Sequence, residues 1–413
     1  MDHDNPIEAL ADLRHEFGEH GGVNMSIEAS STFTVIDPAT MPDIFAGRKG
    51  PEAGGCYLYG RHFNPTVYNV GRQLAALEGT EAAYCTASGM GAISAVITAL
   101  CDAGDHVVAG NAIYGGTWAL LNDFMPRKCN VTTSFVDAAS PEAVSAAITE
   151  RTRLIYVESM SNPTLRVADI PRLSAIARKA GIPLVVDNTF SPLIISPARL
   201  GADIVVHSLT KFIGGASDLI GGAICASNEF IGSLMDLHVG PLMVLGPTMD
   251  PHVAGNIGLR LPHLALRMKA HSERTLALAE RTAALGVDVS YPGLASHPDH
   301  ELLATLHEPE FGFGGLMTID AGTEERAMAM MNCLQNDQRF GYVAVSLGYF
   351  DTLMSCSASS TSSEMPEDAL QQDAIKPGLV RLAVGYTGSL EQRWGQLQKA
   401  LVETGLAECA RVS

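Results

Sequence analysis

The sequence predicts an α/β protein whose larger part is a doubly wound, mostly parallel sheet. From about residue 66, apolar strand-like runs alternate with amphipathic helix-like segments, separated by short glycine or proline breaks. The 413 residues exceed the roughly 250 to 300 at which a single core stops growing, so two domains are expected. A hydrophobic content of 46% with 17% charged residues is typical of a compact globular chain.

Seven apolar runs predict the strands of the large sheet. They are Ala82 to Cys85, His106 to Ala109, Val131 to Val136, Leu154 to Glu158, Leu184 to Asp187, Ile204 to His207 and Gly222 to Ala226. Amphipathic helices lie between several of them, for example from Ile170 to Ala180. Asp169 can cap that helix, Pro171 suits its first turn, and Gly181 can end it.

The pattern changes after about residue 260, which predicts a smaller C-terminal α+β domain. Its expected elements are helices from Pro262 to Leu285 and from Leu390 to Thr404, with strands at Gly314 to Asp320, Tyr342 to Ser346 and Leu379 to Tyr386. The first 60 residues lack long periodic segments. We therefore predict an N-terminal arm over 1–62 that contacts a neighbouring subunit, a large domain over 63–260 and a small domain over 261–413. The serine-rich run from Ser355 to Ser363 predicts a flexible loop.

Charge and composition exclude several classes of partner. The 27 basic and 45 acidic side chains give a net charge of −18, which argues against nucleic acid and anionic membranes. No apolar run approaches the roughly 20 residues that a membrane helix needs, and the acidic N-terminus resembles neither a secretory signal nor a transit peptide. The eight cysteines occur singly, without zinc-ligand spacing. We expect a cytoplasmic protein with reduced thiols, no metal and a small-molecule substrate.

The most informative motifs are the run Val185 to Phe190 and the run His207 to Phe212. In the first, Asp187 ends an apolar strand; in the second, Lys211 follows the next strand. A carboxylate can pair with the ring nitrogen of pyridoxal phosphate, and a lysine whose pKa is lowered by partial burial can form a Schiff base with it. Alone, each residue also has a structural reading, as a strand-end aspartate or a solvated loop lysine. Together and in this order, they favour the cofactor.

A phosphate group would need its own anchor, and the turn at Ser88, Gly89 and Met90 offers one. Here a strand passes into a helix that runs to about Leu100, and free N–H groups at a helix start suit an anion. The motif by itself is weak evidence. Ser208 and Thr210, which flank the approach to the lysine, add donors of the kind a phosphate uses.

Four further residues each allow a structural and a functional interpretation. Tyr114, at the start of a helix, either covers the helix end or stacks on the cofactor and moves a proton. Tyr59 and Arg61, in the predicted arm, are either ordinary surface residues or a clamp that reaches a phosphate across a subunit boundary. Arg381 interrupts an apolar strand, so it needs a salt bridge or binds a substrate carboxylate.

These residues, in this order, resemble the Cys/Met-metabolism (trans-sulfuration) family of fold-type I pyridoxal phosphate enzymes. The resemblance runs from about Tyr57 to the last helix, and it implies an aspartate aminotransferase-like fold. Within the family, four blocks look most like the plant-type methionine γ-lyases: Met243 to Thr248, Ala344 to Gly348, Leu353 to Ser357 and Gly385 to Gln392. Gly116 departs from the well-known bacterial γ-lyases, which carry a cysteine there, and the segment Gly214 to Asp218 lacks a histidine that many relatives have.

The resemblance implies a role for each residue. Lys211 would hold the cofactor covalently, Asp187 would pair with the ring nitrogen, and Tyr114 would stack on the ring. The phosphate would be bound in one subunit by Ser88, Gly89, Met90, Ser208 and Thr210, and from the next by Tyr59 and Arg61. Arg381 and the Ser346 main chain would bind the substrate carboxylate, with Tyr59 beside the substrate and Asn162 near the cofactor. The family also implies a homotetramer built as a dimer of dimers, with active sites shared between subunits.

The resemblance favours α,γ-elimination of L-methionine and related sulfur amino acids to methanethiol, 2-oxobutyrate and ammonia. The alternatives are γ-replacement, as in cystathionine γ-synthase or an O-acylhomoserine sulfhydrylase, and cystathionine γ-lyase activity. A desulfurase-like reaction at Cys356 is less well supported, because its serine-rich surroundings offer no cation to activate the thiol. A ligand-sensing role without catalysis would need an added DNA-binding domain and a basic face, and the sequence has neither.

Overall fold

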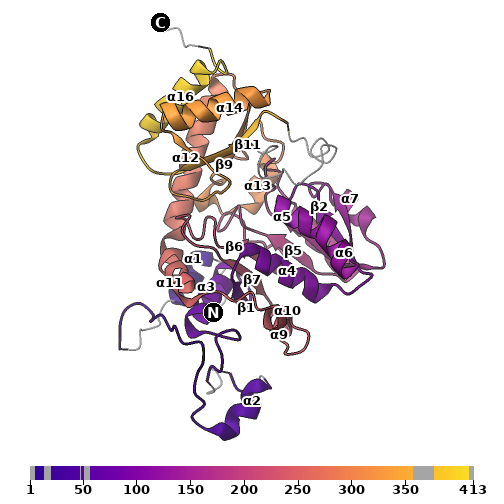
Figure 1. Cartoon of the computed structure of the whole chain (residues 1–413). Helices are drawn as coiled ribbons and strands as arrows, with labels where there is room; N and C mark the ends of the chain where they lie inside the picture. Colours follow the sequence, from indigo (N-terminus) through magenta and orange to yellow (C-terminus); the bar gives the residue numbers. More distant parts are fainter. Residues whose placement is uncertain (1–4, 14–19, 47, 51–55, 357–375, 409–413) are drawn as a thin grey trace. The chain divides into compact units, whose positions relative to one another are not determined.

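The computed structural model describes residues 5–13, 20–46, 48–50, 56–356 and 376–408 (Figure 1). The chain forms two compact units. The first comprises Met1–Ala99, Val206–Leu209 and Leu219–Pro262; the second comprises Leu100–Val205, Thr210–Asp218 and His263–Ser413. The arm over 1–62 and the domain limits expected from the sequence stay predictions.

In the first unit, helix α3 (Pro65–Glu78) packs on strand β1 (Ala82–Thr86). The Asn64 side chain accepts the N–H of Thr66 at 2.9 Å, and Gly79, with φ of 78°, ends the helix. Strand β1 pairs antiparallel with β7 (Gly222–Ala226). The other helices of this unit are α1 (Pro6–Asp12), α2 (Met41–Phe45), α4 (Gly89–Leu100), α9 (Asn228–Leu234), α10 (Pro241–Leu245) and α11 (Pro251–Arg260).

The second unit contains a parallel set of strands. Strand β4 (Thr152–Glu158) pairs with β2 (His106–Gly110) and β5 (Leu184–Asp187), and β2 also pairs with β3 (Thr132–Val136). With β6 (Ile204–Ser208), the order of the seven-stranded sheet is β1-β7-β6-β5-β4-β2-β3. The helices among these strands are α5 (Gly115–Ala119), α6 (Met125–Cys129), α7 (Pro141–Ala147) and α8 (Ile170–Ala180). A mostly parallel large sheet was predicted and is confirmed.

The C-terminal part of the second unit has its own sheet. Its order is β10 (Gly341–Val343), β11 (Thr352–Cys356), β12 (Leu379–Ala383), β9 (Leu316–Asp320) and β8 (Val289–Ser290). Helices α12 (Leu264–Ala284), α14 (Glu324–Asn332) and α16 (Leu390–Glu403) lie around it (Figure 1), while α13 spans His300–Leu306. Buried side chains of these helices and strands, among them Leu278, Met330, Met354, Leu382 and Leu397, form one apolar core.

Three local predictions were wrong. Ser355 and Cys356 do not lie in a flexible loop: both are buried in β11, opposite Arg381 and Val380 of β12. Pairing and burial override the serine-rich composition there, and the rest of that run, 357–363, lies outside the described residues. The strands expected up to Ser346 and up to Tyr386 end three residues early, at Val343 and at Ala383. No helix in the described ranges is long and apolar enough to cross a bilayer.

Candidate active site

Lys211 begins the tight turn that follows β6. The N–H of Gly215 bonds the carbonyl of Lys211 at 2.8 Å, and Arg267 of α12 donates to the carbonyls of Phe212 and Ile213. The Lys211 amine donates to the Ser346 hydroxyl at 3.1 Å. Burial, reinforced by the positive charge of Arg381, lowers the pKa of Lys211 to about 8. A sizeable fraction of this amine is therefore neutral near physiological pH.

A glycine brings the Ser346 segment against this lysine. Gly348 has φ of 76°, a left-handed conformation that side chains disfavour. A Cβ at this position would lie 2.8 Å from the carbonyl carbon of Lys211 and still closer to the main chain of Phe212. The segment therefore rests directly on the lysine's own main chain, which places the Ser346 hydroxyl within reach of the amine.

Arg381 lies in the middle of β12 and is 2% exposed. Its guanidinium donates to the side-chain oxygen of Asn162 and to the carbonyl of Ser346, each at 3.0 Å. Its Nε has no partner, and no carboxylate among the described residues forms a salt bridge with it. Burial lowers the pKa of Arg381 to about 10. The structural salt bridge is thus absent, and a buried cation that bonds only neutral oxygens is suited to an incoming carboxylate.

Asp187 ends β5, where the sequence placed it, and is buried. Its carboxylate accepts the hydroxyl of Tyr156 at 3.1 Å and the N–H of Thr189 at 3.0 Å. Glu158, at the end of β4, lies directly opposite Asp187 in the parallel register. Burial and the neighbouring Asp187 raise the pKa of Glu158 well above its usual range, although nearby N–H groups and Arg381 oppose this. Two carboxyl groups therefore lie side by side, buried, at the carboxyl ends of β4 and β5.

Glu158 also links two predicted site residues. Its Oε1 accepts the N–H of Tyr114 at 2.7 Å, and its Oε2 accepts the N–H of Asn162 at 3.1 Å. Tyr114 caps helix α5 with its ring 45% exposed, as expected for a ring that could cover a ligand. The ring occupies the space that a Cβ on Gly116 would fill, since such a Cβ would lie 2.6 Å from it.

In the first unit, Ser88, Gly89 and Met90 form the turn into α4, as predicted. The Ser88 hydroxyl accepts the N–H of Gly91 at 3.0 Å. A Cβ on Gly89 would lie 2.9 Å from the Cβ of Ser208, so the glycine permits this close approach. Thr210 comes two residues after Ser208 and immediately before the lysine. A small-residue turn at the start of a helix thus lies against Ser208, an arrangement suited to a phosphate.

Tyr59 and Arg61 have partners within their own chain. The Arg61 guanidinium donates to the carbonyl of Met243 in α10 and lies 5.7 Å from the centre of the Tyr59 ring. Tyr59 is 43% exposed, and Arg61 is also exposed. Their expected contribution to a neighbouring subunit stays a prediction.

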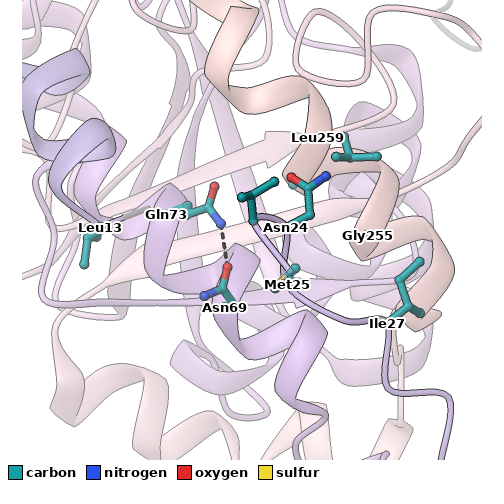
Figure 2. A pocket seen from close by; sticks show the side chains of 10 residues that line it. Leu13, Asn24, Met25, Ile27, Asn69, Gln73, Gly255 and Leu259 are labelled. Atoms are coloured by element: carbon teal, nitrogen blue, oxygen red, sulfur yellow. Dashed lines mark hydrogen bonds between the residues drawn. The ribbon is translucent and has the colours of Figure 1, made fainter. Parts of the chain in front are cut away.

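Each unit contains a cavity. One of about 120 Å³ lies in the first unit, lined by α3, α11 and the segment from Val23 to Ile27 (Figure 2), and contains none of the predicted site residues. The other, of about 140 Å³, lies in the second unit at the ends of β2, β3 and β4 and borders Glu158. The described residues contain no cluster of ligands suited to a metal ion.

Sequence reasoning missed three contributors to this site: Glu158, Tyr156 and Gly348. Glu158 carried a usable signal, because it ends a strand just as Asp187 does. The role of Gly348 depends on a contact with Lys211 across 137 positions of sequence (348 − 211), which no local pattern reveals. The residues present fit pyridoxal phosphate: a lysine with a lowered pKa, a buried carboxylate and a glycine-containing turn at a helix start.

Comparisons with known proteins agree with this chemistry. A family model described as Cys/Met metabolism PLP-dependent enzyme matches residues 9–393. Methionine gamma-lyase of Arabidopsis thaliana is 56% identical over 96% of this chain and 90% of its own length. Cystathionine gamma-lyase of Bacillus subtilis is 37% identical over 82% of this chain and 87% of its own.

Solved structures show the same fold. Cystathionine gamma synthase from Xanthomonas oryzae pv. oryzae superimposes with a TM-score of 0.86 at 32% identity, covering 97% of this chain and 98% of its own. A Campylobacter jejuni structure that contains a pyridoxyl-lysine monophosphate has a TM-score of 0.87 at 26% identity, covering 96% and 99%. From its residues, fold and relatives, the chain belongs to the Cys/Met metabolism family of pyridoxal phosphate-dependent enzymes.

Proposed function

We propose that this protein is a carbon–sulfur lyase that converts L-methionine to methanethiol, 2-oxobutyrate and ammonia by α,γ-elimination. The observation that carries the proposal is the 56% identity, over nearly the whole chain, with a methionine gamma-lyase. A second methionine gamma-lyase, from Treponema denticola, is 35% identical over 89% of the chain. Arg381 supports an α-amino acid substrate, because among the described residues its buried guanidinium forms no salt bridge and its Nε has no hydrogen-bond partner.

We infer the cofactor contacts from the same residues. In the second unit, Lys211 would hold pyridoxal phosphate covalently, Asp187 would pair with its ring nitrogen, and Tyr114 would cover the ring. The family resemblance assigns the phosphate to Ser88, Gly89, Met90, Ser208 and Thr210, and it assigns Asn162 to the cofactor as well. When bound, pyridoxal phosphate supplies an electron sink for the amino acid.

The chain's own groups supply the proton transfers. The Lys211 amine, with its lowered pKa, is the base that removes the proton from Cα. The Tyr114 hydroxyl donates a proton to the departing thiolate. Arg381 and Ser346 hold the α-carboxylate, so that the Cα–H bond faces Lys211, whose amine is 3.1 Å from the Ser346 hydroxyl.

The simplest test of this scheme replaces the lysine. Lys211→Ala should abolish both the visible absorption of the bound cofactor and the release of 2-oxobutyrate. Lys399→Ala is the matched control, since Lys399 is exposed and forms a surface ion pair with Glu403 at 3.7 Å. Lyase activity retained in Lys211→Ala would reject the assignment.

γ-Replacement is the main rival, because several relatives are synthases or sulfhydrylases, such as the cystathionine gamma-synthase of Mycobacterium tuberculosis at 37% identity. Cystathionine γ-lyase activity is the other. Products should be analysed with methionine alone, with cystathionine, and with O-acetylhomoserine plus sulfide. Release of 2-oxobutyrate and methanethiol from methionine alone supports the proposal, whereas homocysteine formed only from the last mixture overturns it.

We also propose a cytoplasmic homotetramer, built as a dimer of dimers, in which Tyr59 and Arg61 complete the neighbouring subunit's site and Tyr59 lies beside its substrate. The exposure of both residues supports this. Sedimentation of the active enzyme tests it: a fully active monomer would contradict the clamp.

A further inference from the structure

We propose that Glu158 is a positioning residue of this active site, because its two carboxyl oxygens hold the main chain at Tyr114 and at Asn162 together. The inference rests on the proposed function, since it concerns how the residues of that reaction are held.

The Glu158 carboxyl group lies between two loops. Glu158 is 8% exposed, and each of its oxygens accepts one N–H group, from Tyr114 at 2.7 Å and from Asn162 at 3.1 Å. These two residues stand on different loops, after β2 and after β4. Among the described residues, Glu158 is the side chain that accepts both N–H groups, so it sets the spacing between the two loops.

A chain of hydrogen bonds connects Asn162 to Lys211. Asn162 accepts from Arg381 at 3.0 Å, and Arg381 donates to the carbonyl of Ser346, also at 3.0 Å. The hydroxyl of Ser346 bonds the Lys211 amine. One arm from Glu158 thus reaches the carboxylate-binding guanidinium and the base, and the other reaches the tyrosine that donates a proton. A displacement at Glu158 would disturb substrate binding through one arm and proton transfer through the other.

The two N–H groups need two acceptor oxygens on one side chain. Glutamine has nearly the same shape, but it offers one carbonyl oxygen and an NH₂ group that repels a facing N–H. Glu158→Gln must therefore lose one of the two bonds. The cavity of about 140 Å³ beside Glu158 leaves room for the displaced loop, so the variant is expected to fold.

Hydrogen exchange of the cofactor-free chain is the direct test. In Glu158→Gln, peptides that contain Tyr114 or Asn162 should exchange deuterium faster, while peptides of α16 should not change. The matched control is Asp105→Asn, which alters another buried carboxylate that accepts a main-chain N–H, from Asp102 at 2.8 Å, and pairs with Arg153. It lies at the opposite end of β2, so exchange at Tyr114 and Asn162 should stay unchanged.

Ligand binding to the holoenzyme is the second readout. L-Norleucine has the shape of methionine without a leaving group, and its binding can be followed in the visible spectrum. We expect Glu158→Gln to weaken norleucine binding about 10- to 100-fold, as when a buried hydrogen-bonding group is left without its partner. Glu158→Asp keeps both acceptors on a shorter stem and should recover part of that affinity. Asp105→Asn should bind norleucine normally, even where its Tm is lower.

The outcomes separate this inference from the proposed function. Unchanged exchange at both Tyr114 and Asn162, or equal loss of norleucine affinity in Glu158→Gln and Asp105→Asn, overturns the positioning role even if methionine is cleaved. Faster exchange and weaker norleucine binding establish it, and they do so even if methionine proves a poor substrate.

Discussion

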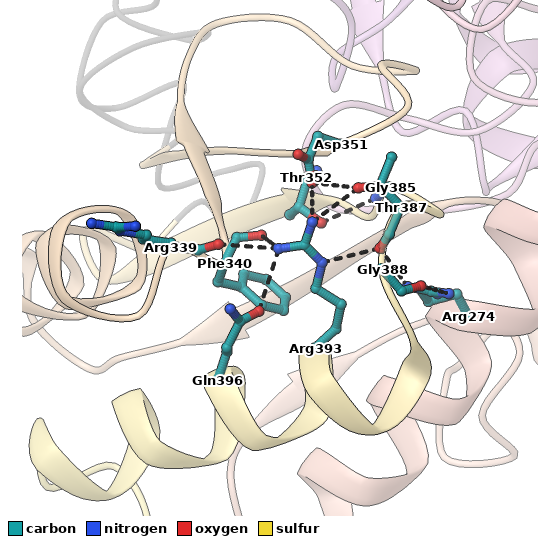
Figure 3. Close-up of polar contacts among 10 residues, drawn as sticks. All are labelled: Arg274, Arg339, Phe340, Asp351, Thr352, Gly385, Thr387, Gly388, Arg393 and Gln396. Atoms are coloured by element: carbon teal, nitrogen blue, oxygen red, sulfur yellow. Dashed lines mark hydrogen bonds and ion pairs between the residues drawn. The ribbon is translucent and has the colours of Figure 1, made fainter.

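Arg393 and Asp351 form an ion pair at 2.7 Å that joins two segments of the site (Figure 3). Arg393, in α16, also donates to the carbonyls of Arg339, Phe340 and Thr387. Residues 339–351 contain Ser346, and Thr387 follows the strand that carries Arg381. A single guanidinium therefore holds both segments of the proposed carboxylate-binding site against one helix.

Loss of this guanidinium should destabilise the second unit and loosen the site. Both partners are largely buried, so Arg393→Ala should lower the free energy of unfolding by about 3 kcal/mol, because Asp351 loses its cation. Calorimetry measures the fall in Tm, and KM for methionine should rise in parallel. Arg281→Ala, which breaks the exposed pair with Glu391 at the same helix, is the control and should change neither quantity appreciably. Equal effects of the two substitutions would contradict this view of Arg393.

Attachment of the cofactor should depend on pH through Lys211. Only the neutral amine attacks an aldehyde, and the lowered pKa of about 8 makes that form abundant above this pH. The rate of appearance of the visible band, after pyridoxal phosphate is added to the cofactor-free chain, should rise with pH and level off above about 8. In Arg381→Met a neighbouring positive charge is lost, so the pKa of Lys211 should rise and the profile should move to higher pH. A profile that does not move would exclude Arg381 as a cause of the lowered pKa.

Arg381 itself should matter for binding and not for stability. In Arg381→Met, norleucine affinity should fall about 10- to 100-fold, while n-pentylamine, which lacks the carboxylate, should bind as before. The Tm should stay the same or rise, because the substitution removes a buried charge that forms no salt bridge with any described residue. A large fall in Tm, with both ligands weakened equally, would indicate a structural role instead.

Gly116 should control the position of the Tyr114 ring. Gly116→Ala places a methyl group 2.6 Å from the present ring, so the ring must move and kcat should fall. Alanine normally stabilises a helix by about 0.5 to 1 kcal/mol over glycine, so lost activity would not reflect unfolding. Gly395→Ala in α16 is the control, because its Cβ meets no atom within 4 Å. Full activity in Gly116→Ala would show that the ring position is unimportant.

Local signals in the sequence predicted much of the fold. The helix from Ile170 to Ala180 has the predicted bounds because its ends are set by residues beside it: Asp169 accepts the N–H of Arg172, and Gly181 adopts φ of 69°. Asp187 at the end of β5 and Lys211 after β6 also lie where the sequence predicted, while their roles stay predictions. Such features depend on neighbours within a few residues.

Features that depend on distant partners escaped prediction. Ser355 and Cys356 read as loop residues, yet pairing with β12 buries them. The antiparallel direction of β1 against β7 joins segments that are 140 residues apart (222 − 82). Glu158 became notable only once the register placed it opposite Asp187 and brought two loops onto its oxygens.

The contact between Gly348 and the main chain of Lys211 has a consequence for motion. With so little clearance between them, the turn cannot slide over the lysine. Any local motion of this segment must carry Ser346, Gly348 and Lys211 together as one rigid piece. The Lys211 amine therefore keeps its alignment with the Ser346 hydroxyl while other segments move.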